Sequence, residues 1–382
     1  MEPLVIYDST LRDGEQCPRG GQIGVDQKMN IARALADLGV NIIEGGYAAA
    51  NETDRKALNQ MAREIAPTGP MIATIARCVP ADIDAAARAL QPAIKIGKAR
   101  IMTFIATSDL HLREKLQMSR STVLDKIRSS VARVADTGAD VAFGAEDASR
   151  SDLSFLTDCI HVAIESGART IDLPDTTGTW VATQAQAFFA EIRRRVQAPD
   201  FVIFATHCHN DKGLATANTL FALQGGARQV ECCLNGFGER AGNAALEEIV
   251  MNVRLSPEVY PYETTIRPER LYTCCCLAAC EMGIDLPYHK AFVGENAFTH
   301  TSGIHQDAWL KSHNPRIYSA VDANLIGRTN DVILTRHSGT KAISYQLRQL
   351  GLPDTPDMRK RVMRVLKQGD KINLTGADIL GF

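Results

Sequence analysis

The chain has 382 residues, of which 42 are Lys or Arg and 44 are Asp or Glu, so its formal net charge is −2. This balance argues against nucleic acid or an anionic membrane as the main partner, because both attract clearly basic proteins. Hydrophobic residues make up 45% of the chain, which excludes a disordered protein. No apolar run approaches the ~20 residues of a membrane span, the N-terminus has no signal-peptide pattern, and most of the ten cysteines lie in apolar segments. We therefore expect a cytoplasmic protein with reduced thiols.

Residues 1–255 alternate between short β-rich runs and amphipathic helical stretches. This alternation predicts a parallel sheet covered by helices, and eight repeats in this length are typical of a (βα)₈ TIM barrel. A doubly wound sheet is the alternative, but the turn after the first run lacks a Gly-rich phosphate loop. The expected strands are Leu4–Tyr7, Asn41–Glu44, Met71–Ile75, Arg100–Ile105, Asp140–Phe143, Thr170–Leu173, Phe201–Thr206 and Gln229–Cys233. The expected helices are Asp26–Leu38, Thr53–Glu64, Ala81–Leu90, Ser121–Thr137, Asp152–Ser166, Ala182–Val196, Gly213–Leu223 and Ala244–Leu255.

The C-terminal third has a different character. Residues 256–290 have a mainly helical pattern, and residues 291–318 are rich in Gly, His, Ser and Thr. We expect residues 1–280 to form the catalytic barrel, 281–318 to form an accessory linker that contributes to the active site, and 319–382 to form a second, small helical subdomain. Four cysteines at 274, 275, 276 and 280 cannot all face one ion on a helix, so we interpret them as small apolar residues of a buried helix.

Polar residues gather where the predicted strands end, which is the reactive face of such a barrel. His207 and His209 are two apart in an extended segment, so both imidazoles point to the same side and can bind one ion. Asp13 follows the first strand and Asn243 follows the eighth, and these strands are neighbours once the barrel closes. Two imidazoles, a carboxylate and an amide oxygen predict an open site for Mg²⁺, Mn²⁺ or Zn²⁺, with two positions left for a substrate bearing a carboxylate beside a ketone.

Two further charged residues are candidates for the chemistry itself. Arg12 precedes Asp13 and can stabilise an oxyanion, or it can form a salt bridge to Glu44 or Glu239 at the barrel rim. Glu146 follows the fifth strand and is a candidate general base, while Asp147 orients a neighbour or begins the next helix.

Together these motifs resemble the 2-isopropylmalate synthase and homocitrate synthase family, with 2-isopropylmalate synthase the nearest match. The resemblance rests on DSTLRDGEQ (8–16), AEDASRSD (145–152), PDTTG (174–178), HCHND (207–211), NGFGERAGN (235–243) and SGIHQD (302–307). It implies a metal-dependent TIM-barrel acyltransferase that condenses acetyl-CoA with a 2-oxo acid, such as 2-oxoisovalerate in leucine biosynthesis. It also implies a homodimer whose accessory region reaches the site of the other subunit.

The resemblance also implies roles for individual residues. The metal ligands are expected to be Asp13, His207, His209 and, more weakly, Asn243. Thr176 is expected to bind the substrate carboxylate, and Arg12 to stabilise the alkoxide. Glu146 and His305 are expected to act as acid and base, with Tyr318 as a further candidate beside His305.

The chain departs from the isopropylmalate synthase pattern near the expected 2-oxo acid. Met102 replaces a histidine, Gly144 replaces a serine, and Gly46-Tyr47-Ala48 replaces Gly-Phe-Pro. Glu44, Met102 and Gly144 are therefore expected at the substrate pocket, and the changes fit either neutral drift or an altered 2-oxo acid. The alternatives are a homocitrate or citramalate synthase, an alkyl- or arylmalate synthase with a specialised substrate, or a metal-dependent aldolase or carboxylyase. Since the sequence ends at Phe382, we expect no leucine feedback through a further C-terminal regulatory domain.

Overall fold

The structure is a computed structural model that describes residues 1–312 and 314–368. Its contacts divide the chain into two units. The first contains Met1–Arg267 and Thr273–Asp285, and the second contains Pro268–Tyr272 and the residues from Leu286 onward. Residues 369–382 of the expected 319–382 subdomain lie outside the described residues.

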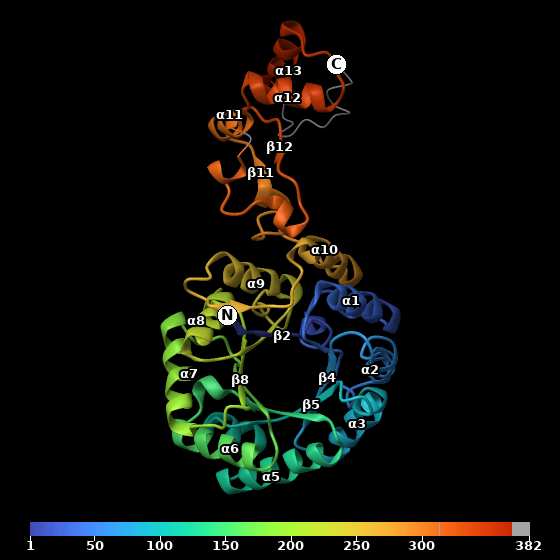
Figure 1. Cartoon of the computed structure of the whole chain (residues 1–382), viewed down its shortest axis with the longest axis vertical. Helices are drawn as coiled ribbons and strands as arrows, with labels where there is room; N and C mark the ends of the chain where they lie inside the picture. The colour runs from blue at the N-terminus through green and yellow to red at the C-terminus, as the bar shows by residue number, and fades with distance from the viewer. Residues whose placement is uncertain (313, 369–382) are drawn as a thin grey trace. The chain divides into compact units, whose positions relative to one another are not determined.

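The first unit is an eight-stranded parallel barrel, which confirms the predicted (βα)₈ fold (Figure 1). Its first and last strands pair from Val5 with Gln229 to Asp8 with Cys232. Most strand residues are buried, as expected when helices cover a parallel sheet. The strands are β2 (Val5–Asp8), β3 (Ile42–Glu44), β4 (Met71–Arg77), β5 (Ala99–Ala106), β6 (Asp140–Glu146), β7 (Thr170–Asp175), β8 (Ile203–Cys208) and β9 (Gln229–Cys232).

Helices follow the strands and lie outside the ring of strands in Figure 1. Local signals explain their ends. The Asn51 side chain accepts a hydrogen bond from the amide of Asp54 at 2.8 Å, and Gly39, with φ of 96°, ends the first helix in a left-handed conformation. The helices are α1 (Val25–Leu38), α2 (Glu52–Glu64), α3 (Pro80–Ile94), α4 (Asp109–His111), α5 (Arg120–Asp136), α6 (Leu153–Glu165), α7 (Ala182–Val196), α8 (Ala215–Gly225) and α9 (Leu246–Leu255).

The segment after α9 is less helical than we expected. Only α10 (Leu271–Met282) and a short 3-10 turn are helical between residues 256 and 290. Before α10, residues 257–259 form a turn, and β10 (Tyr262–Glu263) pairs in parallel with β1 (Glu2–Pro3). On α10, Cys274 and Cys275 are buried and Cys280 is exposed.

The second unit contains short elements around its own apolar core. The strands β11 (Thr299–His300) and β12 (Asp331–Val332) pair in parallel, and the helices are α11 (Gly303–Ser312), α12 (Thr340–Gln349) and α13 (Pro356–Gln368). The core is formed by Val332, Leu334, Ala342, Ile343, Leu347, Val362 and Leu366. In the part of the chain that the structure describes, no helix has both the length and the apolar character to cross a bilayer.

Candidate active site and metal centre

The carboxyl ends of the barrel strands surround a cavity of about 260 Å³. Tyr7, Ile42, Ala73 and their neighbours form a buried apolar cluster on the barrel strands. Most of the polar candidates that the sequence predicted at the strand ends line this cavity, namely Arg12, Asp13, Glu146, Thr176, His207 and His209. The cavity is lined by Arg12, Asp13, Gln16, Ile75, Met102, Phe104, Gly144, Glu146, Asp172, Pro174, Thr176, His207, His209, Glu231, Glu239 and Arg240.

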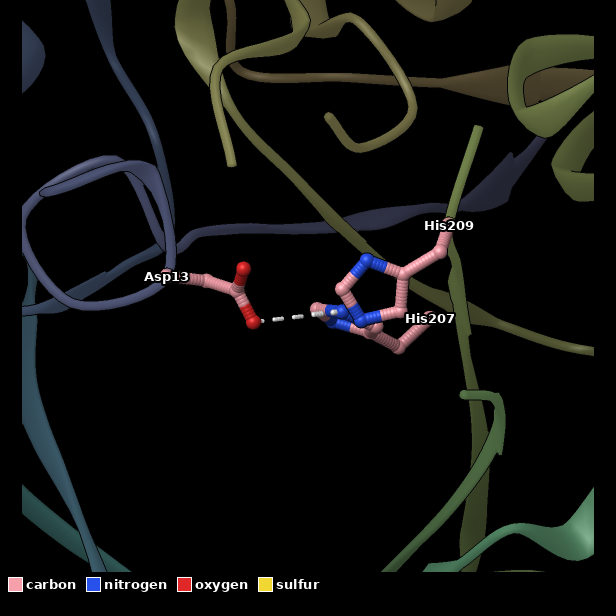
Figure 2. A group of neighbouring side chains, drawn as sticks. All are labelled: Asp13, His207 and His209. Carbon is pink, nitrogen blue, oxygen red and sulfur yellow. Dashed lines mark ion pairs between the residues drawn. The ribbon is translucent and has the colours of Figure 1, made fainter. Parts of the chain in front are cut away.

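Asp13, His207 and His209 converge on one point of this cavity (Figure 2). One ligand atom from each of the three side chains lies within 4.8 Å of the other two. His207 Nε2 is 3.6 Å from Asp13 Oδ2, and the two imidazole rings are 5.0 Å apart. All three residues are buried, so the donors are held in place and shielded from bulk water. A carboxylate and two imidazoles are suitable donors for a divalent cation.

Asn243 lies beside this group and touches it through its amide. Its Nδ2 donates to Asp13 Oδ1 at 3.0 Å, while its Oδ1 is buried and accepts no hydrogen bond from the described residues. The backbone of Gly238 leaves room for it, because a Cβ there would lie 2.4 Å from the Asn243 Nδ2. The unpartnered amide oxygen fits the mixed nitrogen and oxygen donor set that the sequence predicted.

The charges around the three residues favour a neutral imidazole and an ionised carboxylate. Burial by itself raises the pKa of Asp13, but Arg12 and the two imidazoles outweigh it and hold this pKa well below its usual range. Burial and the neighbouring His207 lower the pKa of His209 to about 3, so its ring nitrogens are available as ligands near pH 7. Burial lowers the pKa of His207, but Glu231 and Asp13 outweigh it and raise this pKa above its ordinary value.

Arg12 is held between two carboxylates. Its Nε donates to Glu44 Oε2 at 2.9 Å, and its Nη1 donates to Asp13 Oδ2 at 2.6 Å. Of the two rim partners considered from the sequence, Glu44 is the one it contacts. Glu44 is fully buried and also accepts a hydrogen bond from Ser9 at 2.5 Å. Because Glu44 is not among the residues that line the cavity, its direct contact in this structure is with Arg12 rather than with the cavity space.

Glu146 reaches the cavity from the last position of β6. Its carboxylate accepts a hydrogen bond from Lys115 at 2.5 Å and lies 3.5 Å from His111 Nδ1. The sequence did not single out His111 or Lys115, because they lie about 30 residues before Glu146. The only sequence feature that could have indicated their role is that they are polar residues within Ser108–Leu116, and an ordinary surface turn has the same feature.

Asp147 and Thr176 are joined by a backbone contact. Asp147 has a φ of 64°, rare for a residue with a side chain, and its amide donates to Thr176 Oγ1 at 2.9 Å. Its carboxylate binds Ser108 and Arg150. Since the Thr176 oxygen already accepts a bond, its hydroxyl hydrogen is free to point to the cavity that Thr176 lines.

The remaining side of the cavity carries the residues at which the sequence departs from the family pattern. A Cβ on Gly144 would lie 3.5 Å from Met102 Sδ and 3.2 Å from Phe104 Cβ. The space where a side chain at position 144 would begin therefore lies next to the large side chain of Met102. Asp172 of β7 lines the same side. The sequence did not single out Asp172, because it lies inside an expected strand where an apolar residue is typical.

Lys28 is a further residue that the sequence did not single out. It lies on α1 and is fully buried. Its ammonium donates to the Leu11 carbonyl at 2.9 Å, to Glu15 at 2.5 Å and to Asp54 at 2.7 Å. Lys28 thus holds the segment that carries Arg12 and Asp13. Its buried role could have been predicted from its position, because Lys28 lies within the apolar face of an amphipathic helix.

His305 lies in the second unit, on α11. Its ring stacks on Tyr318, with ring centres 3.8 Å apart and planes inclined by 16°. His300 adds a third ring, 6.1 Å from His305. The structure therefore brings together the two candidates that the sequence named in this region.

Comparisons with known proteins identify the family of the chain. Residues 4–273 match the HMGL-like family and residues 292–373 match the homocitrate synthase post-HMGL domain-like family. The 2-isopropylmalate synthase of Methylorubrum populi is 43% identical over 91% of this chain and 66% of that protein. The 2-isopropylmalate synthase of Carboxydothermus hydrogenoformans is 43% identical over 92% of this chain and 68% of that protein.

The chain spans about two thirds of the length of these curated relatives. Among solved structures, the HMG-CoA lyase of Brucella melitensis superposes with a TM-score of 0.62, covering 74% of this chain and 100% of that chain at 16% identity, which supports the fold. From the family matches and the sequence identities, the chain belongs to the 2-isopropylmalate synthase and homocitrate synthase family of HMGL-like proteins.

Proposed function

We propose that this protein is an acyltransferase that condenses acetyl-CoA with a 2-oxo acid, giving a 2-alkylmalate and free coenzyme A. 2-Oxoisovalerate is the first substrate to test, because relatives more than 40% identical are named 2-isopropylmalate synthase, and leucine biosynthesis is then the pathway. The observation that carries the proposal is the convergence of Asp13, His207 and His209 at the cavity, with Arg12 bound to Asp13.

The residues present fit a divalent cation. Asp13, His207, His209 and the unpartnered Asn243 oxygen would hold it, and Mg²⁺, Mn²⁺ and Zn²⁺ all accept this donor set. When bound, such a cation supplies Lewis-acid polarisation of a keto group. The open cavity beside these donors has room for the carboxylate and keto oxygens of a 2-oxo acid.

The protein groups around the cation site have separate roles in the reaction. Thr176 donates its hydroxyl hydrogen to the substrate carboxylate, and Arg12 stabilises the negative charge that develops on the keto oxygen. Glu146 and His305 act as the acid–base pair. A base removes a methyl proton from the thioester, the resulting carbanion forms a carbon–carbon bond with the keto carbon, and the alkoxide is protonated. Water then cleaves the thioester and releases the coenzyme A thiol.

We also propose that the protein is a cytoplasmic homodimer in which the accessory region of one subunit supplies His305 to the site of the other. Tyr318, which stacks on His305, would support that ring. Cross-complementation tests this arrangement. Mixing an inactive Glu146→Gln subunit with an inactive His305→Ala subunit restores activity only if a site combines residues of both chains.

The defining experiment follows thiol release from acetyl-CoA with a panel of 2-oxo acids and each divalent cation. We expect release that depends on both the 2-oxo acid and the cation, with none when the acid is omitted. Absence of thiol release with every acid would refute the proposal. Cleavage or carboxyl loss from the acid without acetyl-CoA would instead favour the aldolase or carboxylyase alternative.

A further inference from the structure

The side of the cavity formed by Met102, Gly144 and Asp172 contains one unsatisfied polar group. Asp172 lies on β7, has only 4% of its surface exposed and lines the cavity. Its Oδ1 is buried and accepts no hydrogen bond from any residue within the described ranges. Burying an oxygen without a hydrogen bond is unfavourable, so this oxygen invites a hydrogen-bond partner from the ligand.

The surroundings of Asp172 are mainly apolar. Ile75, Met102 and Phe104 line the cavity with it. A Cβ on Gly144 would lie 3.5 Å from Met102 Sδ and 3.8 Å from Asp172 Oδ2, so the missing side chain leaves space between these two residues. A ligand chain that packs on Met102 can thus reach the carboxyl group of Asp172 through the space at Gly144.

The charge of this region limits what such a chain can carry. Glu231 also lines the cavity: its Oε1 accepts a hydrogen bond from Gln229 Nε2 at 3.1 Å, and its Oε2 lies 3.5 Å from His207 Nδ1 but accepts no hydrogen bond from the described residues. A second carboxylate on the ligand would meet the charge of Glu231, and this repulsion disfavours dicarboxylic 2-oxo acids. Burial and then the charge of Glu231 raise the pKa of Asp172 well above its ordinary value. A neutral hydroxyl or amide pairs with either protonation state of this group.

We propose that Asp172 is a specificity-determining residue that selects a 2-oxo acid with a neutral hydrogen-bonding group, a hydroxyl or an amide, on an otherwise apolar side chain. This inference rests on the proposed condensation with acetyl-CoA and names the substrate class for the same site. Gly144 and Met102 provide the space and the apolar surface along which that side chain lies.

The test compares acids that differ only at this group. One pair is 2-oxo-4-hydroxybutanoate and 2-oxopentanoate, in which a hydroxyl replaces a methyl, and the other is 4-hydroxyphenylpyruvate and phenylpyruvate. Thiol release with acetyl-CoA gives kcat/KM for each. We expect the hydroxyl member of at least one pair to be preferred by about tenfold or more, because a site with a buried polar group discriminates against a partner that leaves it unpaired.

Two variants of Asp172 test whether this residue causes the preference for the hydroxyl group. Asp172→Leu removes the polar group at similar volume and should abolish or reverse the preference, whereas Asp172→Asn should keep it. If Asp172→Leu does not fold, as judged by circular dichroism, Asp172→Ala replaces it. Met102→Leu is the matched control on the same side of the cavity and should keep the hydroxyl preference.

Two results would overturn the inference: equal use or preference for the unsubstituted member in both pairs, or an unchanged hydroxyl preference after Asp172→Leu or Asp172→Ala. In either case, thiol release with any 2-oxo acid leaves the proposed function standing. No thiol release with any acid refutes the proposed function itself, and the inference falls with it.

Discussion

The two sides of the barrel cavity are built differently. On one side, Arg12, Asp13 and Asn243 form a dense network in which each side chain is held by a neighbour. On the other side, Met102 and Gly144 lie beside a carboxyl group, Asp172, that has an unpartnered oxygen. We call the first the networked side; its mutual contacts fix the positions of the groups that a chemical step requires. We call the second the sparse side; its unpartnered oxygen can form a hydrogen bond with a ligand, which suits the selection of a substrate. Under the proposed function, the networked side would carry the reaction and the side with Asp172 would select the substrate.

The removal of one imidazole from the networked side should cause the largest loss of activity. His207→Ala should abolish cation binding and thiol release, because two of the three converging donors cannot hold a divalent ion in the same way. Metal content after dialysis and the rate of thiol release measure both effects. His161→Ala, which changes an exposed histidine on α6, is the control. Activity retained within about tenfold would contradict the ligand assignment.

Replacing the candidate base should separate the chemical step from cation binding. Glu146→Gln keeps the size of the side chain but removes its charge, and we expect turnover to fall by about 10²–10⁴-fold with unchanged metal content. Steady-state kinetics and metal analysis measure these values. Glu165→Gln, at an exposed end of α6, should have little effect. If Glu146→Gln loses the metal as well, Glu146 belongs to the cation site instead.

The networked side also depends on a buried lysine behind it. Lys28→Met leaves Glu15 and Asp54 without their shared cation and should lower the free energy of unfolding by about 3–5 kcal/mol. Urea unfolding measures this loss. Lys56→Met breaks only an exposed pair with Glu52 and should leave the free energy of unfolding nearly unchanged. Equal losses in the two variants would show that burial of Lys28 is unimportant.

A change on the sparse side should alter selectivity more than chemistry. Gly144→Ala places a methyl group 3.2 Å from Phe104 Cβ and 3.5 Å from Met102 Sδ. We expect kcat/KM for bulky 2-oxo acids to fall about tenfold relative to small ones, with unchanged metal affinity. Gly339→Ala is the control, since nothing lies within 4 Å of its Cβ position. A uniform loss for all acids would mean that Gly144 does not contact the substrate chain.

The last prediction concerns a pH dependence of stability. Burial raises the pKa of Asp8 to about 7 despite two hydrogen bonds from Thr10 at 2.9 Å. Between the unfolded pKa near 4 and pH 7 the folded state holds a proton that the unfolded state has lost, so the Asp8 contribution to stability falls as pH rises. Asp8→Asn should flatten the profile of urea midpoints over this window, and the exposed Asp26→Asn should not. An unchanged slope in Asp8→Asn would contradict the raised pKa.

Local sequence patterns determined the barrel and the residue types at its mouth. Alternating periodicity gave the eight strands and their helices, and the two-residue spacing of His207 and His209 placed both rings on one side, because these features depend only on near neighbours. The tertiary structure alone decided which partners meet across the barrel. Glu44 rather than Glu239 binds Arg12, Lys28 supports Glu15, and Lys115 and His111 reach Glu146. The tertiary structure also decided that one Asp172 oxygen lacks a hydrogen-bond partner, because this depends on how strands that are distant in the sequence pack together.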